Sequence, residues 1–133
     1  MAAHLSIAVE RWPLANVFTI ARGSKTEAVV VVVEISRDGL RGRGECVPYA
    51  RYGETVEGVL EAIEARREAI EAGLSRAALQ DLVPAGAARN AIDCALWDLE
   101  AKLAGKPAWR MAGLTEPGPL TTAYTISLGE PEA

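Results

Sequence analysis

The first third of the chain shows the alternating apolar and polar positions that are typical of half-buried β-strands. Apolar residues occupy every second position of segment 5–9. A run of valines, residues 29–33, is β-branched and apolar on both faces, which predicts a central strand covered on both sides. A turn signal at 37–39 and a further strand over 40–47 follow. The pattern therefore predicts a three-stranded antiparallel β-meander.

Two loops are expected beside these strands. Pro13 interrupts the first strand, because proline has no N–H to give to a neighbouring strand, and an extended piece over 17–21 follows it. Segment 22–26 contains a turn glycine and no apolar residue, so we expect a loop there. A second loop, rich in aromatic and polar groups, is expected over 48–53, after the last strand of the meander.

After residue 55 the spacing of the apolar residues changes to that of amphipathic helices. Gly73 and Gly105 stand where a glycine ends a helix, and Ser75 stands where a serine caps the start of one. Pro107, just beyond Gly105, also prevents continuation of the preceding helix. We expect four helical segments, over 56–73, 75–83, 88–103 and 108–112.

The last segment does not obviously belong to the meander. Residues 121–128 alternate as a strand does, but they follow the helices and a linker that contains glycine and proline. Residues 129–133 look like the start of a helix, with Pro131 at an early position and acids near the positive end of the helix dipole. Because that helix does not follow, we expect a chain cut from a longer one. The order of elements predicts the α+β class.

Composition narrows the classes of function. The 133 residues carry a net charge of −4, so no general affinity for nucleic acid or an anionic membrane is expected. The longest apolar run, 28–33, is far shorter than the ~20 residues that span a bilayer. Two cysteines, Cys46 and Cys94, fit a reduced, cytoplasmic protein. With His4 as its single histidine, the chain contains no Ser-His-Asp arrangement, and no zinc site made by this chain alone is expected.

The two loops carry the side chains best suited to bind a ligand. Segment 22–26 offers cations and hydroxyls that suit a carboxylate or amide, although a solvated hairpin turn is the simpler alternative. The loop at 48–53 could line a pocket or pack over the sheet edge. For Asp93 and Asp98, five residues apart on one helix, a structural role is expected rather than metal ligation. The candidate binding residues are Arg22, Ser24, Lys25, Tyr49, Arg51 and Tyr52.

Four segments together resemble the N-terminal capping domain of the enolase superfamily. They are Ile20–Glu27 (IARGSKTE), Gly42–Tyr49 (GRGECVPY), Ala88–Leu99 (ARNAIDCALWDL) and Lys102–Pro107 (KLAGKP). The third is similar to the signature of the muconate-lactonizing subgroup. Two shorter segments, Arg51–Glu54 (RYGE) and Thr122–Ser127 (TAYTIS), are similar to dipeptide epimerases of the L-Ala-D/L-Glu type. The resemblance covers essentially the whole chain.

The resemblance implies a fold and a set of binding residues. It implies that residues 1–113 are an enolase-like capping domain, and that 114–133 are a linker and the first strand of a truncated TIM-like (β/α) barrel, whose remainder is absent. In this family two loops of the cap close over the barrel and select the substrate. Arg22, Ser24 and Lys25 match the first loop, Tyr49, Arg51 and Tyr52 match the second, and Thr125 would lie on the first barrel strand, near the substrate.

The resemblance also implies a Mg²⁺-dependent 1,1-proton transfer at the α-carbon of the C-terminal residue of a dipeptide such as L-Ala-L-Glu. The family's two lysine bases and its metal ligands belong to the barrel, so no catalytic residue and no metal ligand is assigned within this chain, and the chain alone is expected to be inactive. The expected partners are the dipeptide substrate, the chain's own C-terminal barrel domain and further copies in a homo-oligomer.

Two alternatives stay open. The cap could belong to another enzyme of the subgroup, a muconate cycloisomerase or an o-succinylbenzoate synthase, because these enzymes share the cap and differ mainly in the specificity loops. A stand-alone, non-catalytic binding module is the alternative from another class. The strand expected over 121–128 argues against such a module, because its apolar side chains and unpaired edge would need a partner.

Overall fold

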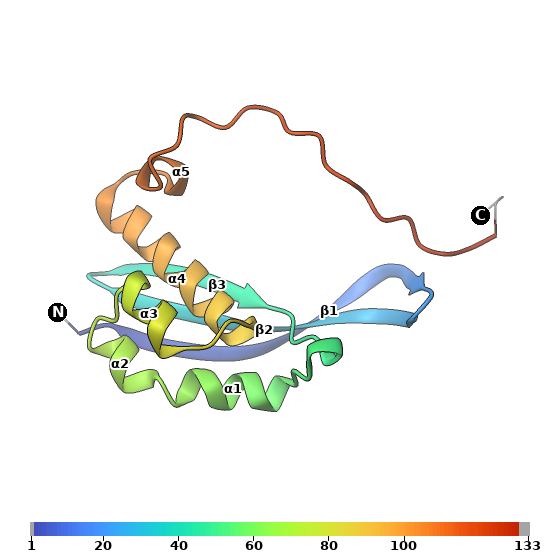
Figure 1. Cartoon of the computed structure of the whole chain (residues 1–133), viewed down its shortest axis with the longest axis horizontal. Helices are drawn as coiled ribbons and strands as arrows, with labels where there is room; N and C mark the ends of the chain where they lie inside the picture. The colour runs from blue at the N-terminus through green and yellow to red at the C-terminus, as the bar shows by residue number, and fades with distance from the viewer. Residues whose placement is uncertain (1, 131–133) are drawn as a thin grey trace.

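The computed structural model describes residues 2–130, which form one antiparallel sheet with helices on one of its faces (Figure 1). The strands are β1 (His4–Ile20), β2 (Gly23–Arg37) and β3 (Leu40–Cys46), in the order β1-β2-β3. The predicted meander is therefore confirmed, with the valine run on the central strand. Val31 and Val33 are fully buried against the helices.

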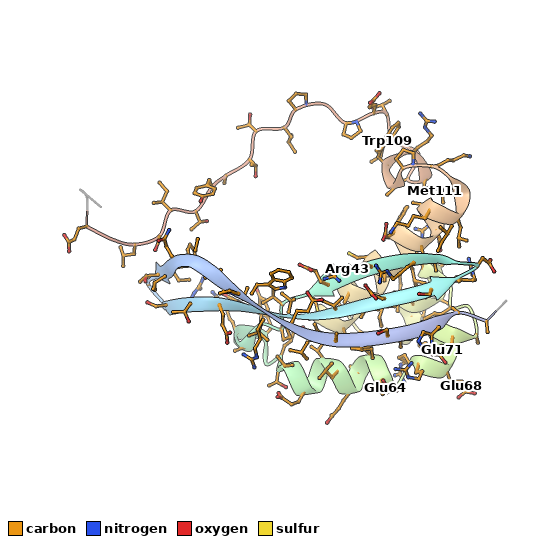
Figure 2. All side chains as sticks on the ribbon, turned by 180° about the vertical axis from the view of Figure 1, so that it is seen from behind. Arg43, Glu64, Glu68, Glu71, Trp109 and Met111 are labelled. Atoms are coloured by element: carbon orange, nitrogen blue, oxygen red, sulfur yellow. The ribbon has the colours of Figure 1, made fainter. Side chains whose placement is uncertain are left out.

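The outer face of the sheet is covered by charged side chains instead of a second layer. Val32 lies on this face and is 2% exposed, in a small hollow that Arg43 and Glu34 also line. Arg43 donates to Glu10 of β1 at 3.0 Å and lies 3.5 Å from Glu34 (Figure 2). The long side chain of an arginine shields apolar surface while its guanidinium stays in contact with water. This accounts for a strand that is apolar on both faces although helices cover only one.

The first hairpin is longer than expected, and the loop predicted within it is wrong. The pairing of β1 is interrupted after Pro13, as predicted, by a register shift between Pro13 and Phe18, but the strand continues to Ile20 because an edge strand tolerates a missing N–H. The loop expected over 22–26 is a tight turn at Ala21 and Arg22, and its other residues belong to β2. Both faces of this outer hairpin meet solvent, so polar residues suit a strand there.

Five helices follow the short 3₁₀ turn η1 (Ala50–Tyr52): α1 (Val56–Glu64), α2 (Arg67–Glu71), α3 (Arg76–Leu82), α4 (Ala87–Ala104) and α5 (Ala108–Met111). The helices predicted from Ser75, over 88–103 and over 108–112 are confirmed. Ser75 accepts the N–H of Ala78 at 3.1 Å, and Gly105 adopts φ 60° at the end of α4. The single helix expected over 56–73 is wrong, because the chain breaks at residues 65–66.

That break directs α2 toward β1. Beyond it, Arg67 donates to the carbonyl oxygen of Leu5 at 2.7 Å, and the Glu71 carboxylate accepts the N–H of the same residue at 3.1 Å. Glu71 also pairs with Arg67 at 3.0 Å. A single straight helix over 56–73 would carry Arg67 and Glu71 in another direction. The break between α1 and α2 therefore goes together with their contacts to β1.

Helix α4 packs directly on β3, where two glycines allow the close approach. A Cβ built on Gly44 would lie 2.1 Å from the carbonyl oxygen of Ala91, and one on Gly42 would lie 2.1 Å from that of Ala95. Both alanines are fully buried. The shared core between the sheet and the helices depends on this small spacing.

The segment after α5 is extended, and within residues 2–130 no strand pairs with it over 121–128, so the strand expected there as part of a barrel stays a prediction. It runs from α5 to the tip of the β1–β2 hairpin (Figure 1), where the Leu128 N–H donates to the Thr19 carbonyl at 2.7 Å. A strand needs a continuous partner for its backbone groups, and this segment meets β1 only near Thr19. The helix start expected around Pro131 lies outside the described residues. No helix within residues 2–130 is long and apolar enough to cross a membrane.

Candidate functional site

Residues of the two candidate segments, 22–26 and 48–53, lie together at one end of the sheet. Lys25 of β2 places its ammonium nitrogen 5.9 Å from the centre of the Tyr49 ring. The Tyr49 and Tyr52 rings are 5.5 Å apart and tilted by 49°. A cation at this distance from an aromatic face is attracted by the ring quadrupole. The structure thus brings Lys25, Tyr49 and Tyr52 into one cluster, the Lys25–Tyr49–Tyr52 cluster.

The loop that carries the two tyrosines is a compact turn. The N–H of Tyr52 donates to the Tyr49 carbonyl at 2.9 Å, and that of Gly53 to the Ala50 carbonyl at 3.0 Å. Gly53 has φ 75°, a conformation that a glycine adopts without steric strain. Tyr52 is 76% exposed, whereas Tyr49 is partly buried. One aromatic ring of the loop is therefore held against the protein and the other is open to a ligand.

The hairpin tip supplies the cations and hydroxyls. Arg22 lies in the turn, and Ser24 and Lys25 follow on β2, all of them exposed. The hydroxyl oxygens of Ser24 and Thr19 are 2.8 Å apart, so a hydrogen bond joins the two strands of the hairpin. Within residues 2–130, Arg22, Lys25 and Arg51 form no ion pair with a carboxylate. Their charges are available to an anionic ligand.

The C-terminal segment reaches the same hairpin through Thr19. The Thr19 N–H donates to the hydroxyl of Ser127 at 2.9 Å, beside the bond from Leu128. Thr125, two residues earlier, is exposed on this segment, and Arg51 is exposed on η1. The structure joins Ser24 to the segment of Thr125 through Thr19, but neither Thr125 nor Arg51 contacts the Lys25–Tyr49–Tyr52 cluster by a hydrogen bond or ion pair.

Glu54 is a residue of this site that the sequence reasoning missed. Its carboxylate accepts the N–H of Ala87 at 2.7 Å and that of Tyr49 at 3.0 Å. These two donors hold the pKa of Glu54 below its usual value, against a smaller opposite effect of burial. The available signal was an acid directly after the loop and just before the helix cap Thr55, which accepts from Gly58.

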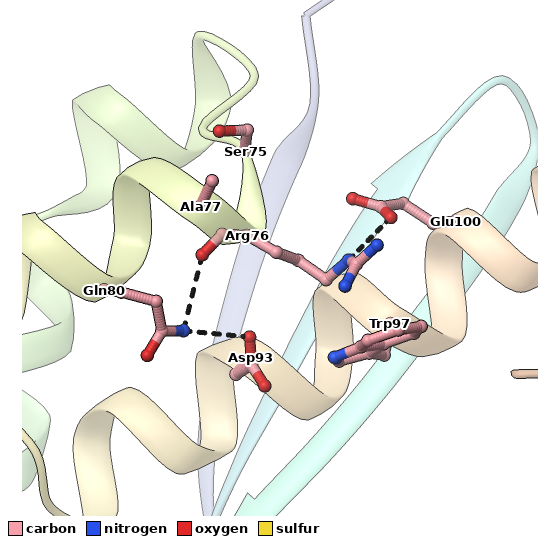
Figure 3. Close-up of a pocket in the computed structure, with 7 residues that line it drawn as sticks. All are labelled: Ser75, Arg76, Ala77, Gln80, Asp93, Trp97 and Glu100. Atoms are coloured by element: carbon pink, nitrogen blue, oxygen red, sulfur yellow. Dashed lines mark hydrogen bonds and ion pairs between the residues drawn. The ribbon is translucent and has the colours of Figure 1, made fainter. Parts of the chain in front are cut away.

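A separate open cleft of about 460 Å³ lies between α3 and α4 (Figure 3). The Arg76 guanidinium lies 3.4 Å from the centre of the Trp97 ring and donates to Glu100 at 2.7 Å. The Gln80 amide donates to Asp93 at 3.3 Å. The polar groups of the cleft are thus paired with one another, and this pairing bridges the two helices. The cleft shares no residue with the two loops.

Divalent-metal binding does not fit the described residues. Among residues 2–130 there is no group of three or more histidine, cysteine, aspartate or glutamate side chains that could hold an ion. A Mg²⁺ site needs several oxygen ligands in a near-octahedral arrangement. The Asp98 carboxylate, for which a structural role is expected, accepts from Lys102 at 2.6 Å and from the N–H of Arg43 at 2.9 Å.

Comparisons with known proteins, by sequence and by structure, point to the same family. Residues 2–113 match the N-terminal domain of the mandelate racemase/muconate lactonizing enzyme family. The chain is 49% identical over 123 residues to the L-Ala-D/L-Glu epimerase of Escherichia coli (strain K12), covering 92% of this chain and 38% of that protein.

Two solved structures are similar over most of the described fold. One is an enolase family member from Agrobacterium tumefaciens with homology to dipeptide epimerases, with bound sodium and L-Ala-L-Glu and an ordered loop. It has a TM-score of 0.91 and 51% identity, covering 98% of this chain and 40% of that one. The other is a dipeptide epimerase from Enterococcus faecalis V583 in complex with Mg and L-Leu-L-Tyr, with a TM-score of 0.71 and 33% identity, covering 84% of this chain and 34% of that one. The chain thus spans about two-fifths or less of these proteins.

Proposed function

Because the chain belongs to the mandelate racemase/muconate lactonizing enzyme family, of the enolase superfamily, through its N-terminal cap domain, we propose that it is the substrate-selecting part of a dipeptide epimerase. The proposal assigns residues 1–113 to the cap, and 114–133 to a linker and the first strand of a catalytic barrel. The observation that carries it is the meeting of Lys25 with Tyr49 at one end of the sheet. A homo-oligomer and a cytoplasmic location stay predictions.

The reaction in this proposal is the inversion of one stereocentre. The α-carbon of the dipeptide's C-terminal residue loses its proton to a base on one face and receives a proton on the opposite face, so no atom is gained or lost overall. The bases and the Mg²⁺ ion lie outside the described residues in this proposal, since residues 2–130 offer no cluster of metal ligands. The part played by this chain is to bind the substrate and to exclude water from it.

The exposed cations of the hairpin tip suit an acidic dipeptide. Arg22 offers a planar donor pair to a carboxylate, and Lys25 offers a second positive charge beside the Tyr49 ring. A hydrogen bond to a charged group contributes about 1.5–3 kcal/mol. Tyr52, Ser24 and Arg51 lie on the same two loops and complete the proposed binding surface, with Thr125 on the C-terminal segment.

The exposed side chains of the C-terminal segment support its assignment to a barrel. Tyr124 is 89% exposed and Ile126 is 81% exposed. Apolar side chains of this size on an extended segment are expected to be buried by a neighbouring structure. In the proposal the rest of the barrel covers them, which also argues against the stand-alone binding module.

The test uses the full-length protein that contains this chain. Incubated with Mg²⁺ and L-Ala-L-Glu in D₂O, it should incorporate deuterium at the glutamate α-carbon and form L-Ala-D-Glu, followed by ¹H NMR and chiral chromatography. Arg22→Met should raise KM for this acidic dipeptide more than for L-Ala-L-Leu. Lys106→Met, which removes an exposed charge beyond α4, is the matched control. Turnover of a muconate or of the o-succinylbenzoate precursor, with no exchange in dipeptides, would instead support the other subgroup enzymes.

A further inference from the structure

The side chain of Glu54 joins two parts of the chain that are far apart in sequence. One carboxylate oxygen accepts the N–H of Tyr49 at 3.0 Å, in the loop over residues 48–53 that carries both tyrosines, hereafter the tyrosine loop. The other accepts the N–H of Ala87, the first residue of α4, at 2.7 Å. The Glu54 N–H also donates to the Tyr49 carbonyl at 3.4 Å. The loop is thus closed on itself and attached to the rigid helix by one side chain.

The start of α4 is built to receive this carboxylate. The residue before the helix is Gly86, which has no side chain to cap the first N–H groups. A Cβ built on Gly86 would lie 2.9 Å from the nearer carboxylate oxygen of Glu54, which is closer than real Cβ contacts. Glu54 therefore takes the place of the missing local cap, and its negative charge lies at the positive end of the helix dipole.

The attachment fixes the aromatic ring next to Lys25. Tyr49 carries both the N–H that Glu54 accepts and the ring that faces the Lys25 ammonium. Tyr52, whose ring is 5.5 Å from that of Tyr49, lies in the same turn. Helix α4 in turn packs closely on β3 over Gly42 and Gly44. The tyrosine loop is thus connected to the sheet through Glu54 and α4.

We propose that Glu54 is a positioning residue for substrate selection, which holds Tyr49 and Tyr52 in their binding arrangement before the substrate arrives. The inference rests on the proposed function for the role of the loop, and on the two carboxylate bonds for the role of Glu54. If the loop is already ordered in the free protein, substrate binding does not have to offset the entropy cost of ordering it. Losing the attachment removes binding that the ground state and the transition state share, so KM rises while kcat is preserved.

The experiment compares Glu54→Gln with the unaltered full-length protein. Glutamine keeps the shape and one acceptor oxygen but loses the charge and the second acceptor. We expect KM for L-Ala-L-Glu to rise about tenfold, with kcat changed less than about twofold. Hydrogen exchange should show faster exchange of the Tyr49 amide, while amides in the middle of α4 keep their protection. Glu57→Gln, the same change at an exposed position of α1, is the control and should alter neither quantity.

Glu54→Asp keeps the charge but is one methylene too short to reach both donors, so it should reproduce the rise in KM with the fold intact. An unchanged KM in an active Glu54→Gln protein would overturn the positioning role, and so would an unchanged exchange rate at Tyr49. A fall in kcat equal to the fall in kcat/KM, with KM constant, would also overturn it. Full-length protein inactive on every dipeptide would refute the proposed function itself, and the exchange measurement would still decide whether Glu54 holds the loop.

Discussion

The backbone N–H of Arg43 in β3 donates a 2.9 Å hydrogen bond to the carboxylate of Asp98 in α4. Two other side chains of the same helix also form hydrogen bonds with the backbone of β3, in their case as donors. Lys102 donates to the Arg41 carbonyl at 2.7 Å, and Asn90 donates to the Glu45 carbonyl at 3.3 Å. The three side chains are spaced by multiples of four along α4, so they lie on one stripe of the helix.

This stripe occupies the free edge of β3. An exposed strand edge presents unpaired N–H and C=O groups on which another chain can add. Here three side chains of α4 bond the Arg41 carbonyl, the Arg43 N–H and the Glu45 carbonyl, so the helix covers part of this edge. Burial alone would raise the pKa of Asp98, but the hydrogen bonds from Lys102 and from the Arg43 N–H outweigh it and hold that pKa below its usual value.

Asp98→Ala should therefore destabilise the fold and expose the strand edge. The Arg43 N–H and the Lys102 ammonium both lose their acceptor at a partly exposed position, and we expect a loss of about 0.5–1.5 kcal/mol in the free energy of unfolding, measured by urea titration. Sedimentation velocity should show more self-association than for the unaltered protein. Asp81→Ala, at an exposed position of α3, is the control and should change the free energy by less than about 0.5 kcal/mol. Equal stability of the two variants would contradict the structural role of Asp98.

A methyl group at Gly44 should separate α4 from β3. The new Cβ would lie 2.1 Å from the Ala91 carbonyl oxygen, which belongs to the helix backbone and cannot move alone. Overpacking of this kind costs about 1–3 kcal/mol or more, so Gly44→Ala should lower the melting temperature clearly. Gly118→Ala is the matched control, because a Cβ there meets nothing within 4 Å. Similar melting temperatures for the two variants would contradict the close packing.

The elements with a strong periodic pattern could be predicted from sequence, and the exceptions have physical reasons. The valine run and the long helix α4 have unambiguous spacing. Ser24 and Lys25 have no strand pattern, and they belong to β2 through their pairing with β1, in a hairpin whose exposed faces tolerate polar residues. The break between α1 and α2 accompanies the bond from Arg67 to the Leu5 carbonyl, a contact between residues 62 positions apart. The meeting of the two candidate loops follows from the meander. The link from Glu54 to Ala87 does not, since nothing near Glu54 in the sequence indicates where α4 begins.

Stability should fall in acid, in part through Glu71. Its carboxylate accepts the N–H of Leu5, and this bond, with Arg67 and His4 nearby, holds the pKa of Glu71 below its usual value, although burial opposes the shift. A group whose pKa is lower in the folded protein stabilises it above the unfolded value, about 4.3 for glutamate, and loses that effect as the pH falls through the folded value.

Urea titrations at pH 6, 5, 4 and 3 should therefore show a smaller acid-induced decrease for Glu71→Gln than for the unaltered protein. The control is Glu68→Gln, one turn away on the exposed side of α2 (Figure 2), which should keep the full decrease. Parallel curves for Glu71→Gln and the unaltered protein would show that Glu71 has no part in the pH dependence.

The two thiols should differ strongly in reactivity. Cys46 is 6% exposed at the end of β3, and burial, together with the charge of Glu54, raises its pKa to about 11. Partial burial and the charge of Asp93 raise the pKa of Cys94 as well, but Cys94 is exposed on α4, so access to the reagent separates the two thiols. Since the thiolate is the reactive form, an aromatic disulfide reagent at pH 8 should modify Cys94 quickly and Cys46 only on unfolding. Absorbance should show one fast thiol in the native protein and two in 6 M guanidinium chloride, with the fast phase lost in Cys94→Ser. Two native thiols reacting at similar rates would mean that β3 opens at Cys46 far more often than its packing against α4 allows.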